Sequence, residues 1–469
     1  MENGQKRKPS VWEALIPVVA LVAILSFSIL KYEASPHIPL IFSAIIAAFM
    51  AMRVGLKWNE IEKGIIDTIG MSMQAIIILM IIGTVIGAWI LSGTVPAMIY
   101  YGLKILSPGI FLVATLIISS IVSLATGSSW TTAGTVGIAL IGVGQGLGIP
   151  LPMVAGAVVS GAYFGDKMSP LSDTTNLAPA MAGATLFDHV RHMIFTTGPS
   201  YLIALVVYAI LGAKFAGRQL DVAQINQILD ALSKQFNISI WLLIPPIVVI
   251  VMVVKKVPAI PGLLSGTILG AIFAVIFQGK GFGDILSVLN DGYVSETGFK
   301  IVDDLLTRGG LQSMMYTVSL ILCAMTFGGI MEKAGFLEVL AEKLLSFSDS
   351  VGALVTATIF SSIFTNIVAG DQYLSIVIPG RMFKKAFDKK GLHPKNLSRC
   401  LEDAGTLTSP LVPWNTCGAF MMGALGVHPF AYLPYAVLNY VNPFVSIFYG
   451  FTGITMEKVK PEEKVTINA

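Results

Sequence analysis

Long apolar runs constrain this chain more than any other feature of its sequence. They cover residues 14–30, 37–52, 73–91, 193–213, 239–254, 259–277 and 429–449. At about 1.5 Å per residue, a helix of this length is about long enough to cross a hydrocarbon core of roughly 30 Å. Only 12% of the 469 residues are charged, about half the share in soluble domains. The sequence therefore predicts an all-α polytopic membrane protein.

The remaining composition excludes several other classes of protein. The basic start MENGQKRKPS precedes an apolar run without a small-residue cleavage site, so we expect a first span rather than a cleaved signal peptide. Cys323, Cys400 and Cys417 lie in or beside apolar segments and predict neither a disulfide framework nor a metal site. The net charge of +3 gives no indication of nucleic-acid binding.

Some of the expected helices are interrupted by polar residues. The helices over 152–185 and 397–426 are predicted to be broken spans. The stretches 109–149 and 350–380 are polar at their middle, and we expect re-entrant hairpins that enter and leave the membrane on one side. The unbroken spans are expected at 11–30, 37–53, 73–91, 193–213, 239–254, 259–277, 311–331 and 429–452, which together with the broken spans makes ten crossings.

The distribution of positive charge predicts the orientation of these spans. One side of the expected topology holds 21 of the 30 lysine and arginine residues, and loops rich in these residues usually stay in the cytoplasm. We therefore expect both termini in the cytoplasm. The loops 214–238 and 278–310 are then the longest external segments.

Two pairs of similar segments indicate an internal repeat. ATLIISSIVSLATG at 114–127 resembles ATIFSSIFTNIVAG at 357–370, at an offset of 243. GDKMSPLSD at 165–173 matches GTLTSPLVP at 405–413 in its SPL, at an offset of 240. The expected topology gives the two copies opposite orientations. Inverted repeats with interrupted helices are typical of secondary transporters, whose binding site lies near the midplane.

The repeat predicts how the chain is organised. We expect N-terminal scaffold helices at 1–72, a first repeat at 73–213, connecting scaffold helices and loops at 214–310, a second inverted repeat at 311–452 and a cytoplasmic tail at 453–469.

The stretch FGDKMSPLSDTTN, 164–176, places charges where the chain should lie in lipid. Pro170 cannot donate to the carbonyl of Asp166, so this carbonyl should be exposed at a helix break, with Ser169 as the N-cap of the next half-helix. Pro410 and Ser409 should do the same in the second copy. Charged side chains at this depth are costly and usually functional. Prolines that only kink the helices are the alternative interpretation.

The hairpin tips add oxygen atoms beside these breaks. Gly127 and Gly370 should form tight turns, and the offset pairs Ser128 with Asp371. Carboxylate, hydroxyl and carbonyl oxygens suit Na⁺, whereas half-helix N-termini favour anions. Alternatively, the hairpin tips reach the membrane–water interface, where Trp130 and Tyr373 would act as anchors. The candidate ion- or substrate-binding residues are Ser128, Ser129, Thr131, Asp166, Lys167, Ser169, Asp173, Thr174, Thr175, Asn176, Asn366, Asp371, Thr408, Ser409 and Asn415.

The roles of four further titratable residues are less constrained by sequence. Glu402 and Asp403 precede the second break, either as a proton relay or as part of a charged cytoplasmic mouth. We expect His189 and His192 in a solvated cytoplasmic loop. Lys167 would neutralise one carboxylate while another binds the cation.

At FGDKMSPLSDTTNLAP, 164–179, the chain resembles the NhaC family of bacterial sodium/proton antiporters, within a wider ion-transporter superfamily. The resemblance extends to 83–102, to SLATGSSWTTAGT at 123–135 and to TLTSPLVPWNTCG at 406–418. It implies a monovalent-cation/proton exchanger with a scaffold domain for dimer contact and a moving transport domain. Some close relatives look like malate/lactate exchangers that also use sodium and protons. The motif and the repeat then point to Asp166, Ser169, Asp173, Thr174, Thr175, Asn176, Asp371, Thr408, Ser409 and Asn415.

The resulting hypothesis is a Na⁺/H⁺ antiporter of the bacterial inner membrane. Na⁺ and H⁺ would compete for Asp173, helped by Asp166 or Asp371. No cofactor is expected besides the transported ions, and the expected partners are the lipid bilayer and a second copy in a homodimer. The alternatives are a sodium- and proton-coupled malate/lactate exchanger, a passive channel and, more remotely, an intramembrane aspartyl protease that uses Asp166 and Asp371.

Overall fold

The regular structure of this protein is helical throughout the residues that the computed structural model describes, 7–32, 34–216 and 222–459. Within these ranges no strand is present, and only two isolated β-bridges occur. Residues 1–6, 217–221 and 460–469, which belong to the predicted N-terminal segment, the first external loop and the tail, lie outside the described residues.

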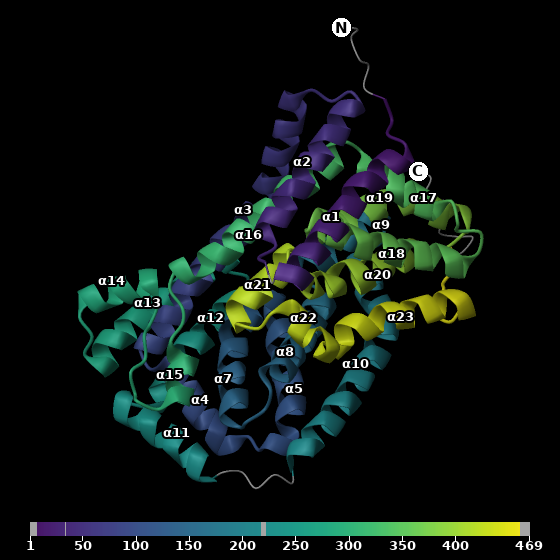
Figure 1. The fold of residues 1–469 in the computed structure, drawn as a ribbon. Coiled ribbons are helices and arrows are strands. Elements are labelled where there is room, and N and C mark those ends of the chain that lie inside the picture. Colours follow the sequence, from purple (N-terminus) through teal and green to yellow (C-terminus); the bar gives the residue numbers. More distant parts are fainter. Residues whose placement is uncertain (1–6, 33, 217–221, 460–469) are drawn as a thin grey trace.

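The first half of the chain begins with long helices and then breaks into shorter ones (Figure 1). The helices are α1 (Val11–Tyr32), α2 (His37–Arg53), α3 (Trp58–Leu91), α4 (Thr94–Ile105), α5 (Pro108–Thr126), α6 (Ser129–Thr132), α7 (Ile138–Gly146), α8 (Leu151–Met168), α9 (Asp173–Ala182) and α10 (Leu186–Ala216). A π-helical turn, Ala133–Gly137, joins α6 to α7.

The second half has a similar mixture of long and short helices. They are α11 (Val222–Gln235), α12 (Ile244–Val254), α13 (Ala259–Gln278), α14 (Phe282–Asp291), α15 (Lys300–Leu306), α16 (Met315–Lys333), α17 (Phe336–Leu345), α18 (Val351–Ala369), α19 (Gln372–Lys389), α20 (Pro394–Leu401), α21 (Thr416–Leu425), α22 (Pro429–Tyr432) and α23 (Val437–Thr452). A second π-helical turn, Glu402–Thr406, follows α20.

The lengths of these helices confirm a multi-pass, all-α membrane protein. Among the described residues, 7 helices are long and apolar enough to cross a membrane, or up to 8 if the bent pair Ile225–Gln235 and Ile240–Val254 is one span. The predicted ten crossings also include α2, the span at 429–452 and the broken helices, whereas the seven helices include α5 and α18 of the predicted hairpins. The number of crossings therefore stays a prediction. The inverted orientation of the repeat and the re-entrant character of the hairpins also stay predictions.

Two helices begin earlier than their apolar runs suggest. α3 starts at Trp58, because Glu60 accepts a hydrogen bond from the backbone N–H of Lys57 at 2.8 Å and caps the helix there. α10 starts at Leu186 and therefore includes His189 and His192. Both histidines are buried, with 0% and 2% exposure. The prediction of a solvated loop at these histidines is wrong, because their helix packs against the rest of the protein.

Small residues let the helices of this fold pack closely. α5 lies against α8, and a Cβ atom added at Gly165 would come within 2.3 Å of the backbone nitrogen of Leu124. α3 lies alongside α16, where a Cβ atom at Gly329 would come within 2.9 Å of the carbonyl oxygen of Gly64. Close backbone approach at glycine is the usual way in which membrane helices associate.

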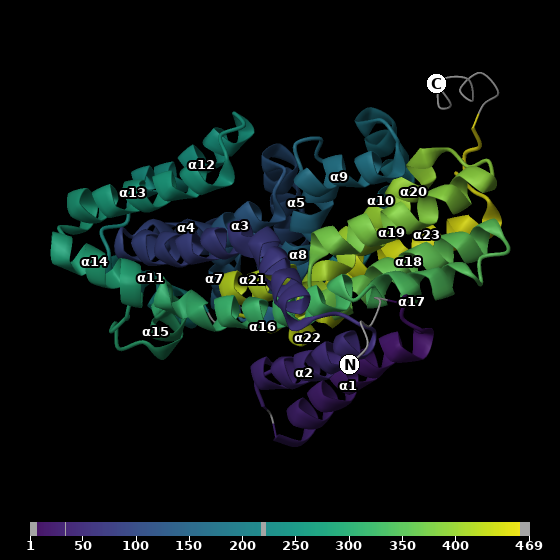
Figure 2. The ribbon, with the colours of Figure 1, turned by 90° about the horizontal axis from the view of Figure 1, so that it is seen from above.

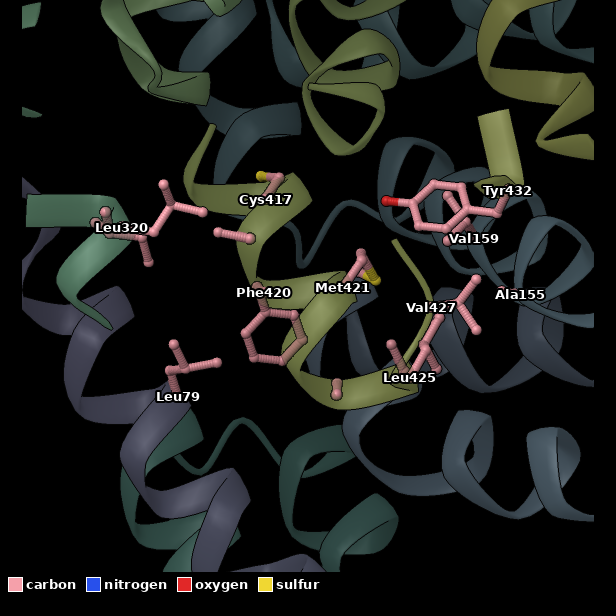
Figure 3. Close-up of a cluster of buried hydrophobic side chains, with 14 of the residues drawn as sticks. Leu79, Ala155, Val159, Leu320, Cys417, Phe420, Met421, Leu425, Val427 and Tyr432 are labelled. Atoms are coloured by element: carbon pink, nitrogen blue, oxygen red, sulfur yellow. The ribbon is translucent and has the colours of Figure 1, made fainter. Parts of the chain in front are cut away.

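The short helix α21 lies at the centre of the buried core. Figure 3 shows Leu79 of α3 and Leu320 of α16 on one side of α21, and Ala155 and Val159 of α8 on its other side. Phe420 of α21 is fully buried among them. This packing anchors the second broken helix between elements of both halves of the sequence.

The N-terminal and the connecting helices flank this core on different sides. α1 and α2 pair with each other and contact α16 and α17, whereas α13 contacts α3, as the view from above shows (Figure 2). This arrangement fits a scaffold around α3 and α16. The domain boundaries given by the sequence stay a prediction.

Candidate functional site

Both hairpins turn at the predicted glycines with the same local structure. Gly127 follows α5 with φ +66°, and Gly370 follows α18 with φ +68°, a left-handed conformation that favours glycine. The next residue then caps the following helix in each case. The Ser128 hydroxyl accepts a hydrogen bond from the Thr131 N–H at 3.1 Å, and Asp371 accepts one from the Leu374 N–H at 3.1 Å. The predicted tight turns are confirmed.

Both broken helices restart later than the sequence predicts. α9 begins at Asp173 with Ser172 as its N-cap, and α21 begins at Thr416 with Asn415 as its N-cap. Ser169 and Ser409 lie inside the breaks and do not cap the new half-helices. The backbone is extended at Ser169 and forms a short 3₁₀ turn from Ser409, so several residues follow each interruption before helical geometry resumes.

Side chains satisfy the backbone carbonyls that the first break exposes. The Thr175 hydroxyl donates to the carbonyl oxygens of Asp166, at 3.2 Å, and Lys167, at 3.0 Å. The Asn176 amide donates to the carbonyls of Pro170 and Ser172. The prediction that the Asp166 carbonyl is free to hold an ion is therefore wrong. Thr175 and Asn176 stabilise the break because buried carbonyls need donors.

The hairpin tips and the first break enclose a cavity of about 700 Å³. Six of the predicted candidates line it: Ser128, Ser129, Thr131, Asp166, Asp173 and Asp371. The sequence analysis did not assign several further polar residues of the lining, Ser72, Gln74, Thr126, Lys256, Gln372 and Thr416. Thr416 and Gln372 directly follow predicted residues, whereas Ser72 and Gln74 lie within a helix that showed no interruption.

Asp166 brings a partly unsatisfied carboxylate to this cavity. Its Oδ2 accepts hydrogen bonds from the Ser129 backbone N–H at 3.2 Å and from the Ser129 hydroxyl at 2.6 Å. Its Oδ1 has no hydrogen-bond partner in the described part of the chain, although the residue is only 6% exposed. A buried carboxylate oxygen without a donor favours binding of a cation or a proton.

Asp173 and Asp371 are the two other aspartates that line the cavity. Asp173 accepts from the Thr174 N–H at 2.8 Å and from the Tyr373 hydroxyl, which comes from the second hairpin. Asp371 is 4% exposed. Across the described residues, no three His, Cys, Asp or Glu side chains stand close enough to hold one metal ion. The three aspartates therefore do not form one shared carboxylate cage.

Lys167 belongs to a separate buried cluster. It forms an ion pair with Asp403, and both side chains are fully buried. The same Asp403 oxygen accepts hydrogen bonds from Thr196 at 2.9 Å and Asn442 at 2.7 Å. Lys167 therefore pairs with Asp403 and not with a cavity carboxylate. Glu402 and Asp403 have 0% exposure, which contradicts their placement at a solvated cytoplasmic mouth.

Comparison with known proteins identifies the family of this chain. The sequence model of the Na⁺/H⁺ antiporter family matches residues 161–454. The chain belongs to this family. It is 42% identical to the Na⁺/H⁺ antiporter NhaC of Alkalihalophilus pseudofirmus over 97% of this chain and 98% of that protein.

Two further relatives, both from Bacillus subtilis, are similar along nearly the whole chain. One is a malate-2H⁺/Na⁺-lactate antiporter, 39% identical over 95% of this chain and 96% of the relative. The other is a Na⁺/H⁺ antiporter NhaC, which is 41% identical over 92% of this chain and 96% of the relative. The resemblance seen in the sequence motifs is thereby confirmed, and the chain is a member of a transporter family.

In this antiporter-family chain, other predicted residues hold the second hairpin to the second break. The Asn366 amide donates to the Gly405 carbonyl at 2.8 Å and to the Thr408 hydroxyl at 3.0 Å. The Asn415 amide donates to Asn366 Oδ1 at 3.0 Å. None of these side chains lines the cavity. The candidates that do not line it are Lys167, Ser169, Thr174, Thr175, Asn176, Asn366, Thr408, Ser409, Asn415, Glu402 and Asp403.

The aromatic residues of the hairpin tips make internal contacts. Trp130 stacks on Phe420 with 4.1 Å between ring centroids, and Tyr373 donates to Asp173. The tips therefore meet the core and the cavity. The role of these two rings as membrane-interface anchors stays the alternative interpretation.

Proposed function

We propose that this chain exports cytoplasmic Na⁺ in exchange for external protons. The single observation that carries the proposal is the Asp166 oxygen without a partner, in a cavity built by both hairpin tips and the first break. The family and two relatives named Na⁺/H⁺ antiporter support it.

The cavity offers a simple basis for exchange. Asp166, Asp173 and Asp371 place three carboxylates around one space, so bound positive charge reduces their mutual repulsion. Either a Na⁺ ion or a proton relieves this repulsion, which makes the two ions compete. Hydroxyls of Ser129 and Tyr373, already hydrogen-bonded to the carboxylates, would complete the oxygen shell of Na⁺.

The proposal can be tested in proteoliposomes that carry an imposed pH gradient. Asp173→Asn is expected to abolish the collapse of the gradient on addition of Na⁺, because the amide can neither release a proton nor attract the cation. Asp188→Asn, at a half-buried position in the first turn of α10 and outside the cavity, is the matched control and should behave as the unmodified protein. Collapse of the gradient by Asp173→Asn at the unmodified rate would show that the assignment is wrong.

A second candidate is sodium- and proton-coupled exchange of malate and lactate, because one relative carries that name. The cavity opposes this candidate, since Lys256 is its only cationic lining residue among the described ones and three carboxylates line it as well. In the same assay, Na⁺ should collapse the gradient without any organic acid. A requirement for malate or lactate would favour the second candidate.

The cellular setting is part of the same proposal. The excess of lysine and arginine on one side supports cytoplasmic termini in a bacterial inner membrane. A homodimer through the scaffold helices is proposed from the resemblance. A protease reaction at Asp166 and Asp371 has no support in the family, whose members are transporters.

A further inference from the structure

Glu402 is a buried carboxyl group that the cavity does not use. It lies in the π-helical turn Glu402–Thr406, between α20 and the second break. The residue has 0% exposure, and neither of its carboxylate oxygens has a hydrogen-bond partner in the described part of the chain. An ionised carboxylate without donors is strongly disfavoured in such a place. Its surroundings therefore favour the neutral, protonated form of Glu402.

The nearest charged groups form an ion pair beside this carboxyl. Lys167 of α8 faces Glu402, and Asp166, whose carboxylate lines the cavity, acts on Glu402 electrostatically. Arg399 and Asp403 belong to the same stretch of chain as Glu402. Lys167 is occupied by Asp403, and Arg399 donates to Thr455 at 2.8 Å. Lys167 and Arg399 thus contact other groups, so Glu402 has no ion-pair partner within the described ranges.

The other elements around the turn contribute few titratable groups. α18 packs against it and contains none, and the only one in α9 is Asp173. α19 presents Ser375 and Ile376 to Gly405. Of the titratable groups on α10, His189 and His192 lie near Asp403, and those of α23 are Tyr440 and Tyr449.

The surroundings of Glu402 are built for a polar occupant. The hydroxyls of Thr406 and, from α9, Thr174 lie beside Glu402, and neither Glu402 nor Thr406 has a well-formed hydrogen bond in the described residues. A buried carboxyl group without a well-formed hydrogen bond is an exception that calls for a functional explanation. π-helical turns also occur frequently at functional sites.

We propose that Glu402 is a proton-carrying site separate from the cavity carboxylates. When its proton leaves to water, the ionised Glu402 competes with Asp403 for Lys167, so one cation is shared between two carboxylates. Asp166 and Lys167 are adjacent at the end of α8, one facing the cavity and the other this cluster. A cation bound at Asp166 therefore acts on the same helical turn that holds Lys167. This inference rests on the proposed Na⁺/H⁺ exchange.

The test compares two transport modes of Glu402→Gln in proteoliposomes. Glutamine keeps the size of the neutral side chain but cannot release a proton. Na⁺ movement driven by a pH gradient is expected to fall about tenfold or more, while isotope exchange of Na⁺ for Na⁺ at equal pH persists with an unchanged KM. Asp173→Asn, in contrast, should lose both modes. Glu338→Gln, exposed on α17, is the control.

Three outcomes would overturn the inference. In the first, Glu402→Gln moves Na⁺ along the pH gradient at the unmodified rate. In the second, Glu402→Gln elutes as a single folded species but loses both transport modes. In the third, Glu402→Gln has a raised KM for Na⁺. If Glu402→Gln does not fold, Glu402→Asp replaces it. This variant should keep gradient-driven exchange with a shifted pH profile, and an unchanged profile contradicts the inference. Failure of the unmodified protein to exchange Na⁺ for H⁺ would instead reject the proposed function.

Discussion

At the scale of single residues, the contact between Tyr373 and Asp173 links the second hairpin to the first break. Tyr373→Phe removes this donor from the solvent-exposed carboxylate of Asp173, a net loss of about 0.5–1.5 kcal/mol. A bound cation relieves that cost, so the apparent KM for Na⁺ should fall, by up to about tenfold. The measurement is the Na⁺ dependence of gradient collapse at fixed pH.

Tyr316→Phe is the matched control for this substitution, because Tyr316 is an exposed tyrosine outside the cavity. A rise in the KM of Tyr373→Phe would contradict the expectation. It would mean that the Tyr373 hydroxyl oxygen binds Na⁺ directly. Losing this ligand would then weaken Na⁺ binding more than the freed Asp173 oxygen strengthens it.

The sequence indicated some of these residues and misassigned others for a physical reason. Asp166 and Asp173 stand out because charge is rare in apolar helices, and both line the cavity. Lys167 is also a rare charge in an apolar helix, but its partner Asp403 is 236 positions away in the sequence, so the sequence does not show the pair. Neighbouring residues of a helix point in different directions, which is a signal against pairing Lys167 with the cavity.

At the scale of elements, the packing of α5 against α8 positions the first break. A Cβ atom at Gly165 would meet the Leu124 nitrogen at 2.3 Å and the Ser120 carbonyl oxygen at 2.6 Å. Gly165→Ala must push these backbones apart, so we expect a loss of about 1–3 kcal/mol in stability. The measurement is the apparent Tm of the purified protein in detergent.

Gly70→Ala serves as the control for this packing effect. Gly70 lies in α3 with nothing within 4 Å of an added Cβ atom, so alanine should leave stability unchanged or raise it slightly. If both variants melt at the same temperature, the close packing of α5 on α8 does not limit stability.

The breaks show what a motif can and cannot specify about an element. The repeat located both turns correctly, because Gly127 and Gly370 occupy matched positions that need positive φ. Serine followed by proline is also a helix-start signature, yet Ser169 and Ser409 do not cap their helices. Ser172 caps α9 instead, and the hydrogen bonds that Thr175 and Asn176 make to the carbonyls of the break hold the chain in this geometry.

At the scale of the whole molecule, the described end of the chain is fastened to the start of α20. The His393 N–H donates to the Glu457 carbonyl at 2.9 Å, and Lys395 lies 2.5 Å from the Glu457 carboxylate. The segment after α23 and the basic segment before α20 therefore lie on the same face of the protein. The count of lysine and arginine residues had placed both segments on one side of the membrane, but it could not show the contacts of Glu457.

This arrangement leads to a prediction about orientation in the membrane. In a background with Cys323, Cys400 and Cys417 replaced by alanine, Lys389→Cys and Lys300→Cys place one exposed thiol each on opposite predicted sides. Because lysine-rich loops stay inside, an impermeant maleimide should label the thiol at 300 in intact cells. The thiol at 389 should react only after permeabilisation. The reverse pattern would place the basic face outside, and with it the described C-terminal segment, whose contacts bind it to that face.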